Sequence, residues 1–138
     1  MKTVGYSGTP LAKKLGIKEG DALQVFNTPK SYPDFFEHFP KDVDILQEQE
    51  IPNTINFIHI FCTTKEELVH YFSIAKPNLR KDGMLWISWP KKSSKIETDL
   101  DQLFILNFGL KNGLVDTKVA AIDADWSGHK FVYRKKDR

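Results

Sequence analysis

Blocks of apolar residues, separated by polar turns, predict strands that alternate with helices along this chain. The strongest strand covers residues 55–61, which are apolar on both faces apart from Asn56 and His59. This pattern is typical of a central strand in a parallel sheet, because both faces of such a strand are covered. Other strands are predicted at residues 22–26, 43–46 and 84–89, with a C-terminal hairpin at 114–122 and 130–134.

Helix signals lie between these strands. Thr64 and Glu67 have the spacing of a capping box, in which two side chains bind the free backbone N–H groups of the first turn. The helix that follows carries one apolar stripe, formed by Leu68, Tyr71, Phe72 and Ala75. Pro77 limits its length. Another helix is predicted to begin within residues 98–101 and to end at Asn112 and Gly113. Its inward side is predicted to consist of Leu100, Leu103, Phe104 and Phe108.

Two shorter helices are predicted from the signals at their ends. Thr9 can cap the first, Pro10 suits its first turn and Gly16 can supply a left-handed stop. Ser31 can cap the second, which would carry Phe35, Phe36 and Phe39. The pair Asp82-Gly83 predicts a turn before the strand at 84–89.

These elements predict a three-layer, Rossmann-like α/β fold with a mostly parallel sheet and an antiparallel C-terminal hairpin. The 138 residues suit a single domain, 1–138. Within it, residues 1–20 form an arm and a short helix, with Gly5 and Gly8 letting the arm turn, and residues 134–138 form a basic tail. A single Cys excludes a disulfide framework. Without an apolar leader or a membrane-length apolar run, a cytoplasmic protein that does not enter membranes is expected.

The net charge of +2 conceals separate charged blocks. Residues 1–20 hold four cations and one anion, residues 76–95 six and one, and residues 126–138 five and one. These basic segments could converge on one face and form an anion-binding surface. Alternatively, they are unrelated solvated faces, and the tail is a frayed terminus.

The order of elements resembles a shortened methyltransferase sheet, in which residues 79–87 are similar to the fifth strand. Several runs also resemble a bacterial family known as a domain of unknown function, number thirty fifty-two. The most specific are Trp-Ile-Ser-Trp-Pro-Lys-Lys at 86–92 and Trp-Ser-x-x-Lys-Phe-Val at 126–132. The resemblance covers nearly the whole chain and implies no catalytic residues.

The turn after the first predicted strand, at 22–26, decides the expectation about cofactors. Methyltransferases of this fold meet S-adenosylmethionine at a glycine-rich turn, since the backbone must approach the ligand closely. Residues 27–30 contain no glycine, and Pro29 removes a backbone donor. Glu48 could lie where an acidic residue binds a ribose. We therefore expect no cofactor, and methyl transfer is not favoured.

The main candidate site follows the buried strand at 84–89. Trp89 offers an aromatic face, and Lys91 and Lys92 emerge at the carboxyl edge of the sheet, where open α/β sheets bind ligands. Asn27 and Thr63 leave parallel strands at the same edge. These residues could bind a phosphate or a carboxylate. Alternatively, the lysines form a solvated loop and the tryptophan packs in the core.

Other chemistry is less well supported by the sequence. The four histidines lack metal-binding spacing, so no metal site is expected, and His59 is interpreted as a core residue. Cys62 is interpreted as a semi-buried structural thiol, because no base is identifiable beside it. Nucleic-acid binding is not expected, since no known motif accompanies the basic tail.

The leading hypothesis is a non-enzymatic module that binds an anionic small molecule or a protein partner. The first alternative is an enzyme with an unrecognised, degenerate transferase-like site at the same edge. The second alternative is a weak nucleic-acid binder that uses the basic tail.

Overall fold

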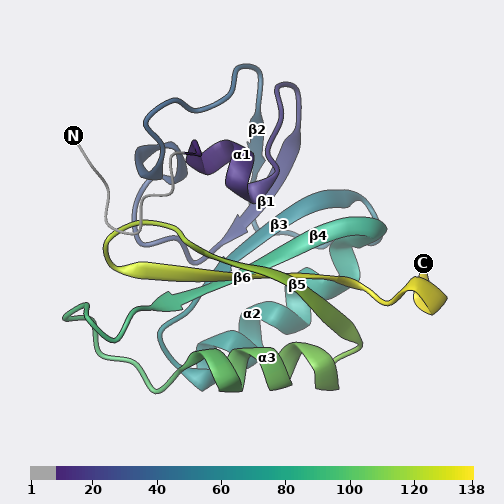
Figure 1. The fold of residues 1–138 in the computed structure, drawn as a ribbon. Coiled ribbons are helices and arrows are strands. Elements are labelled where there is room, and N and C mark those ends of the chain that lie inside the picture. Colours follow the sequence, from purple (N-terminus) through teal and green to yellow (C-terminus); the bar gives the residue numbers. More distant parts are fainter. Residues whose placement is uncertain (1–8) are drawn as a thin grey trace.

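The computed structural model describes residues 9–138 (Figure 1). In chain order, the elements are α1 (Leu11–Leu15), β1 (Ala22–Phe26), the 3₁₀ helix η1 (Tyr32–Phe35), β2 (Asp44–Leu46), β3 (Ile55–Phe61), α2 (Lys65–Asn78), β4 (Leu79–Pro90), α3 (Gln102–Lys111), β5 (Leu114–Ala121), β6 (Trp126–Tyr133) and the 3₁₀ helix η2 (Lys135–Asp137). Gly5 and Gly8, predicted to turn the N-terminal arm, lie outside the described residues. No helix within residues 9–138 has the length and apolar character needed to cross a membrane.

The six strands form one sheet in the order β2-β1-β3-β4-β6-β5. Strands β2, β1, β3 and β4 are parallel to one another, and β6 pairs antiparallel with both β4 and β5. This arrangement confirms the predicted mixed α/β sheet with a C-terminal hairpin. The carboxyl ends of β1, β3 and β4 consequently meet at one edge, on the left in Figure 1.

Each face of the sheet has its own apolar core. Helices α2 and α3 cover one face, where Phe72 and Ile105 join the buried residues of β3 and β4. Helix α1 and η1 cover the other, where Leu15 packs in the same cluster as Trp86. The Trp86 indole N–H also donates to the Leu15 carbonyl at 3.0 Å, which fastens α1 to β4. Three layers result, as predicted.

The capping box of α2 forms with one change. The Thr64 hydroxyl accepts from the Glu67 N–H at 3.0 Å, as predicted. The Glu67 carboxylate, however, accepts from the Thr63 N–H at 2.7 Å rather than from Thr64. Pro77 lies inside the last turn of α2, and Leu79 already begins β4.

The two short helices differ from their predicted forms. Pro10, not Thr9, occupies the N-cap position of α1, while Gly16 ends it with φ 92°, as predicted. The segment after Ser31 is a single 3₁₀ turn without a side-chain cap. Three phenylalanines explain the difference, because their rings pack around the Tyr32 ring; these are Phe35, Phe36 and Phe39.

The predicted turn at Asp82-Gly83 is wrong, because both residues lie within the twelve-residue strand β4. Here the β3–β4 register is irregular, moving from Ile55↔Leu79 to Phe57↔Met84. A Cβ on Gly83 would lie 2.8 Å from the Asn56 carbonyl oxygen. This glycine therefore permits a close backbone approach instead of a chain reversal.

The predicted inward side of α3 is partly wrong. The helix begins at Gln102, capped by the Asp101 carboxylate, which accepts from the Phe104 N–H at 2.8 Å. Leu103 is 66% exposed, whereas Ile105 is fully buried. Leu100 is buried but precedes the helix, so a helical period counted from it assigns the wrong residues to the core.

Candidate functional site

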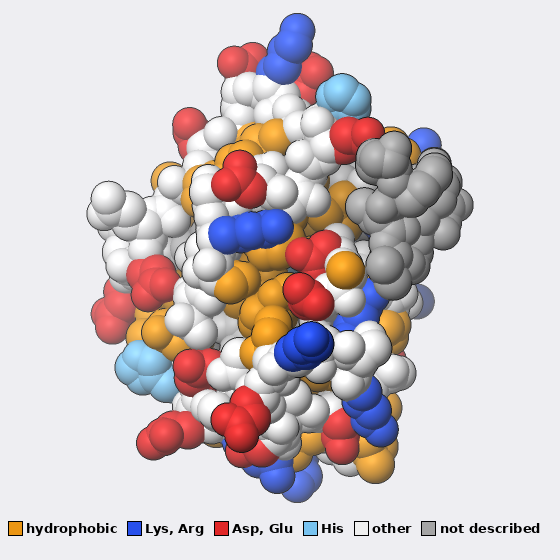
Figure 2. Space-filling view, turned by 90° about the vertical axis from the view of Figure 1, so that its left-hand side faces the viewer, with side chains coloured by type: hydrophobic (Ala, Val, Ile, Leu, Met, Phe, Trp, Pro, Cys, Tyr) orange, Lys and Arg blue, Asp and Glu red, His pale blue; other side chains and the backbone are white. Residues whose placement is uncertain are grey.

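The carboxyl edge of the sheet is the candidate site, since the predicted ligand-binding residues follow β1, β3 and β4 there. Figure 2 views this side of the molecule. Hydrophobic side chains reach the surface near its centre, with basic and acidic side chains among them. The edge thus offers both apolar surface and charge, the mixture that small-molecule sites use.

Asn27 organises the turn after β1. Its φ of 58° is left-handed, a conformation that Asn adopts more readily than most residues other than Gly. Its backbone N–H donates to the Glu48 carboxylate at 3.0 Å, and its side-chain amide donates to the Phe61 carbonyl at 2.9 Å. Asn27 therefore joins the end of β1 to the end of β3 and to the loop after β2.

Thr63 is engaged in the start of α2. Its N–H and hydroxyl both donate to the Glu67 carboxylate, at 2.7 and 3.1 Å. Its carbonyl accepts from the Thr98 hydroxyl at 2.6 Å and from the Asp99 N–H at 3.3 Å. These bonds make Thr63 part of the scaffold behind the edge.

The three residues predicted around the end of β4 separate in space. Trp89 is buried in the core under α2 and α3, so its ring does not form an open face at the edge. Lys91 is half-buried, and its N–H donates to the Asp125 carbonyl at 2.8 Å, beside the β5–β6 turn. Lys92 is exposed. The edge thus brings Asn27 close to the end of β3, while Lys91 lies toward the hairpin.

Contacts across the edge include residues that the sequence did not single out. The Phe35 ring stacks on Phe61 with centroids 5.2 Å apart, and the Lys30 ammonium lies 4.5 Å from the Phe35 centroid. Lys30 also lies 3.9 Å from the Asp123 carboxylate in the hairpin turn. No local sequence signal could reveal this pair, because its members are far apart along the chain.

His59 lies beneath the edge in a closed polar network. Its Nδ1 is 2.7 Å from the Tyr32 hydroxyl, and its Nε2 is 2.7 Å from the Ser88 hydroxyl. Complete burial lowers the pKa of His59 to about 3, so the ring is neutral at pH 7. His59 is the satisfied core residue that the sequence predicted.

Cys62 is also structural, and it is more deeply buried than predicted. Its thiol is inaccessible and donates to the Ser88 carbonyl at 3.6 Å. Burial, together with the charges of Glu67 and Asp99, raises the pKa of the Cys62 thiol. It therefore stays protonated and is unsuited to act as a nucleophile. Within residues 9–138, no three His, Cys, Asp or Glu side chains gather in a way that could hold a metal ion.

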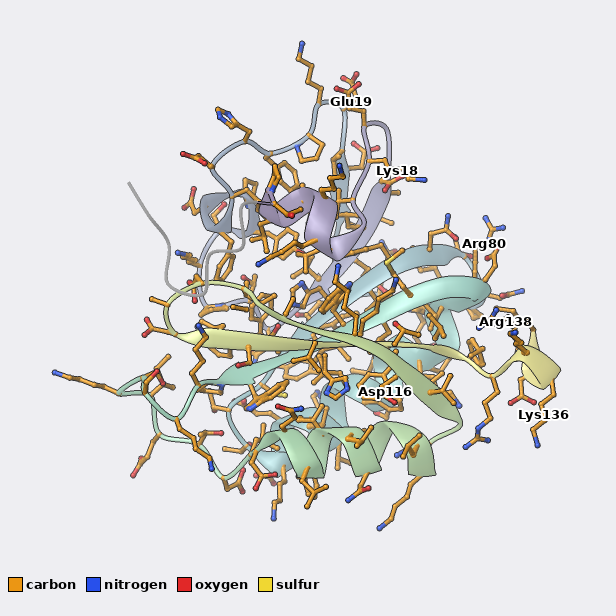
Figure 3. All side chains as sticks on the ribbon, viewed as in Figure 1. Lys18, Glu19, Arg80, Asp116, Lys136 and Arg138 are labelled. Atoms are coloured by element: carbon orange, nitrogen blue, oxygen red, sulfur yellow. The ribbon has the colours of Figure 1, made fainter. Side chains whose placement is uncertain are left out.

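The basic tail lies away from this edge and is hydrogen-bonded to α3. Residues of η2 form a 3₁₀ turn, and the Arg134 guanidinium donates to the Leu110 carbonyl at 2.9 Å. Figure 3 shows Lys136 and Arg138 at the opposite end of the sheet, on the same side as Arg80. The basic groups of the tail are therefore remote from the candidate site.

Solved structures similar to this chain share its fold. A SAM-dependent methyltransferase from Aquifex aeolicus aligns with a TM-score of 0.62 and 15% identity, over 88% of this chain and 86% of that one. The 1,6-didemethyltoxoflavin-N1-methyltransferase of Burkholderia thailandensis, solved with S-adenosylhomocysteine, aligns with a TM-score of 0.58 and 9% identity, over 88% and 73%. A structure described as a pericyclic reaction enzyme aligns with a TM-score of 0.55 and 10% identity, over 91% and 47%. No protein-family model and no curated protein sequence matches the chain.

These comparisons correct two expectations drawn from the sequence. The leading hypothesis of a non-enzymatic binding module is corrected, because several of the similar structures are methyltransferases, which supports the first alternative, an enzyme with a transferase-like site, better. The argument against methyl transfer from the absent glycine turn is wrong for the same reason. The chain has the architecture of these enzymes although its turn after β1 has another sequence.

Proposed function

We propose that this chain is a methyltransferase-like enzyme that binds S-adenosylmethionine at the carboxyl edge of its sheet. The observation that carries the proposal is the bond between Glu48 and the Asn27 N–H. Folds that bind dinucleotides hold the ribose with an acidic residue about 20 residues beyond the turn after the first strand. Glu48 has this place in the chain and is exposed.

The residues at the edge fit the nucleoside part of the cofactor. The Glu48 carboxylate would accept hydrogen bonds from the ribose hydroxyls, with Asn27 holding it in position. The left-handed conformation of Asn27 gives the chain a sharp turn, which glycine commonly provides in this kind of loop. When bound, S-adenosylmethionine supplies an electrophilic methyl group attached to a sulfonium.

The remaining predicted residues belong to this proposal as well. Lys91 and Lys92 follow the end of β4 and would face an acidic group of the substrate, while Asn27 and Thr63 hold the ends of β1 and β3. Membership of the bacterial family of unknown function is likewise proposed, on the strength of the runs at 86–92 and 126–132. A cytoplasmic location is part of the same expectation.

Isothermal titration calorimetry with S-adenosylhomocysteine tests the proposal. We expect saturable binding that Glu48→Gln weakens by roughly tenfold or more, because a charged hydrogen-bond acceptor is lost. Glu50→Gln is the matched control, since Glu50 is exposed in the same loop. Absence of binding, or equal affinities for the two variants, would contradict the proposal.

A second candidate is an enzyme of this fold with a reaction other than methyl transfer. One structural neighbour is described as a pericyclic reaction enzyme, so the fold is compatible with other chemistry. In that case the calorimetry would detect no binding of S-adenosylhomocysteine.

A further inference from the structure

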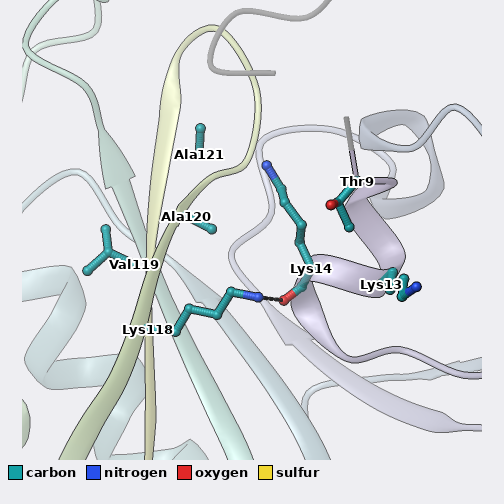
Figure 4. Close-up of a pocket in the computed structure, with 7 residues that line it drawn as sticks. All are labelled: Thr9, Lys13, Lys14, Lys118, Val119, Ala120 and Ala121. Carbon is teal, nitrogen blue, oxygen red and sulfur yellow. Dashed lines mark hydrogen bonds between the residues drawn. The ribbon is translucent and has the colours of Figure 1, made fainter. Parts of the chain in front are cut away.

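A pocket lies between α1 and the carboxyl-terminal half of β5, on the face of the sheet that α1 covers. It has a volume of about 560 Å³, and its lining includes Thr9, Lys13, Lys14, Lys118 and Ala120 (Figure 4). Pockets of this size suit small-molecule ligands. Among the described residues, the lining holds three lysines and no acidic residue.

The local structure directs these lysines outward. Ala12 and Leu15 occupy the buried side of α1, which leaves Lys13 exposed and Lys14 half-buried beside the pocket. On β5, Lys118 and Ala120 are two residues apart and share one face of the strand. The small side chain of Ala120 leaves room above the sheet.

Lys118 is fixed in place across the pocket. Its ammonium donates to the Lys14 carbonyl at 2.8 Å, which spans the gap from β5 to α1 (Figure 4). A lysine held in this way is partly ordered before any ligand arrives, so binding costs less side-chain entropy.

Lys130 and Lys91 extend the positive charge around the pocket. Lys130 on β6 lies directly opposite Lys118, an arrangement of like charges that destabilises a strand pair. Burial and the charge of Lys118 lower the pKa of Lys130. Burial and the charges of Lys118 and Lys91 lower the pKa of Lys14. Lysines from four segments of the chain therefore repel one another in one region.

None of these lysines forms a salt bridge within residues 9–138. The salt bridges found within residues 9–138 join Lys30 to Asp123, Arg80 to Asp82 and His129 to Asp116. None of them involves a lysine of the pocket. A bound anion would supply the missing negative charge.

We infer that the pocket between α1 and β5 binds a small molecule through a phosphate or diphosphate group. Lysine ammonium groups act as point charges toward phosphate. Several of them together suit an anion that carries more than one negative charge. The pocket residues differ from Asn27 and Glu48 of the proposed cofactor site, so the two sites can be tested separately.

Calorimetry with pyrophosphate, on the full chain at low ionic strength, tests the inference. We expect one-to-one binding that Lys118→Gln weakens by about tenfold or more, through loss of a charged donor. Lys118 is exposed, so the variant is expected to fold. Lys136→Gln is the matched control, since it removes one exposed charge at the opposite end of the molecule (Figure 3).

A second variant separates a pocket from general attraction to a basic surface. Ala120→Leu fills the space without changing any charge and is expected to abolish binding. Unchanged affinity in Ala120→Leu, or equal affinities for Lys118→Gln and Lys136→Gln, would overturn the inference. It would also be overturned if a short single-stranded RNA bound at about 0.15 M salt while pyrophosphate did not, because the lysines would then serve a nucleic acid.

Discussion

Asn27 and His59 show how polar side chains are used within the sheet. Asn27 gives its N–H to Glu48 and its side-chain amide to the Phe61 carbonyl. The two ring nitrogens of His59 are hydrogen-bonded to the hydroxyls of Tyr32 and Ser88, one as donor and the other as acceptor, because the ring is neutral. The first arrangement positions an exposed carboxylate at the edge, whereas the second satisfies a residue that water cannot reach.

The buried state of His59 predicts how stability depends on pH. Its pKa is about 3 in the folded protein and near 6.5 when unfolded, so only the unfolded chain takes up this proton between those values. The free energy of unfolding is therefore fully retained above pH 6.5. It decreases by about 1.4 kcal/mol per pH unit as the pH falls below that value.

Urea unfolding between pH 7.5 and pH 5 measures this dependence. His59→Gln is expected to be less stable at neutral pH and to lose part of the slope below pH 6.5. His70→Gln, which changes an exposed histidine on α2, is expected to keep the slope. If His59→Gln and the original chain show the same slope, the neutral buried histidine is disproved.

Helix α3 depends on one glycine at its contact with β6. Gly109 is buried, and a Cβ there would collide with the ring of Phe131, which is itself fully buried. We predict that Gly109→Ala lowers the free energy of unfolding by about 1–2 kcal/mol, because overpacking outweighs the better helix propensity of Ala. Urea denaturation gives the value, and Asn107→Ala, on an exposed position of α3, is expected to change it little.

A double variant shows whether the collision is the cause. Phe131→Leu removes part of the ring, so combining it with Gly109→Ala should cost less than the sum of the two separate losses. Strict additivity would show that Gly109 acts through the backbone instead.

Elements with a strong local pattern were predictable from the sequence. The strand at 55–61 and the cap at Thr64 formed as expected, because both depend on residues close together along the chain. Gly83 was misjudged as a turn, since its role depends on the Asn56 carbonyl of a neighbouring strand. The 3₁₀ turn at 32–35 was missed because the Phe residues around Tyr32 favour packing over a regular helix.

At the scale of the whole molecule, the charged blocks acquire a place in space. The sequence left open whether its basic segments converge. Lys14, Lys91 and Lys130 belong to three of these segments. Lys14 lines the pocket, the charge of Lys91 acts on Lys14, and Lys130 lies opposite Lys118, while the tail is at the other end. This convergence depends on the pairing of β5 with β6 and on the position of α1, so no sequence pattern could predict it.

The candidate edge was predictable only in part. Asn27 and Thr63 follow adjacent parallel strands, which places them at one edge by topology alone. The sequence could not indicate that Trp89 turns into the core or that Lys30 pairs with Asp123. Both depend on the contacts of the finished fold.

A crystal structure of the full chain with S-adenosylhomocysteine tests the central claim most directly. The account predicts the nucleoside at the carboxyl edge, with its ribose hydroxyls within hydrogen-bond distance of the Glu48 carboxylate and the pocket between α1 and β5 left free. A ligand seated elsewhere, or a ribose that does not contact Glu48, would contradict it.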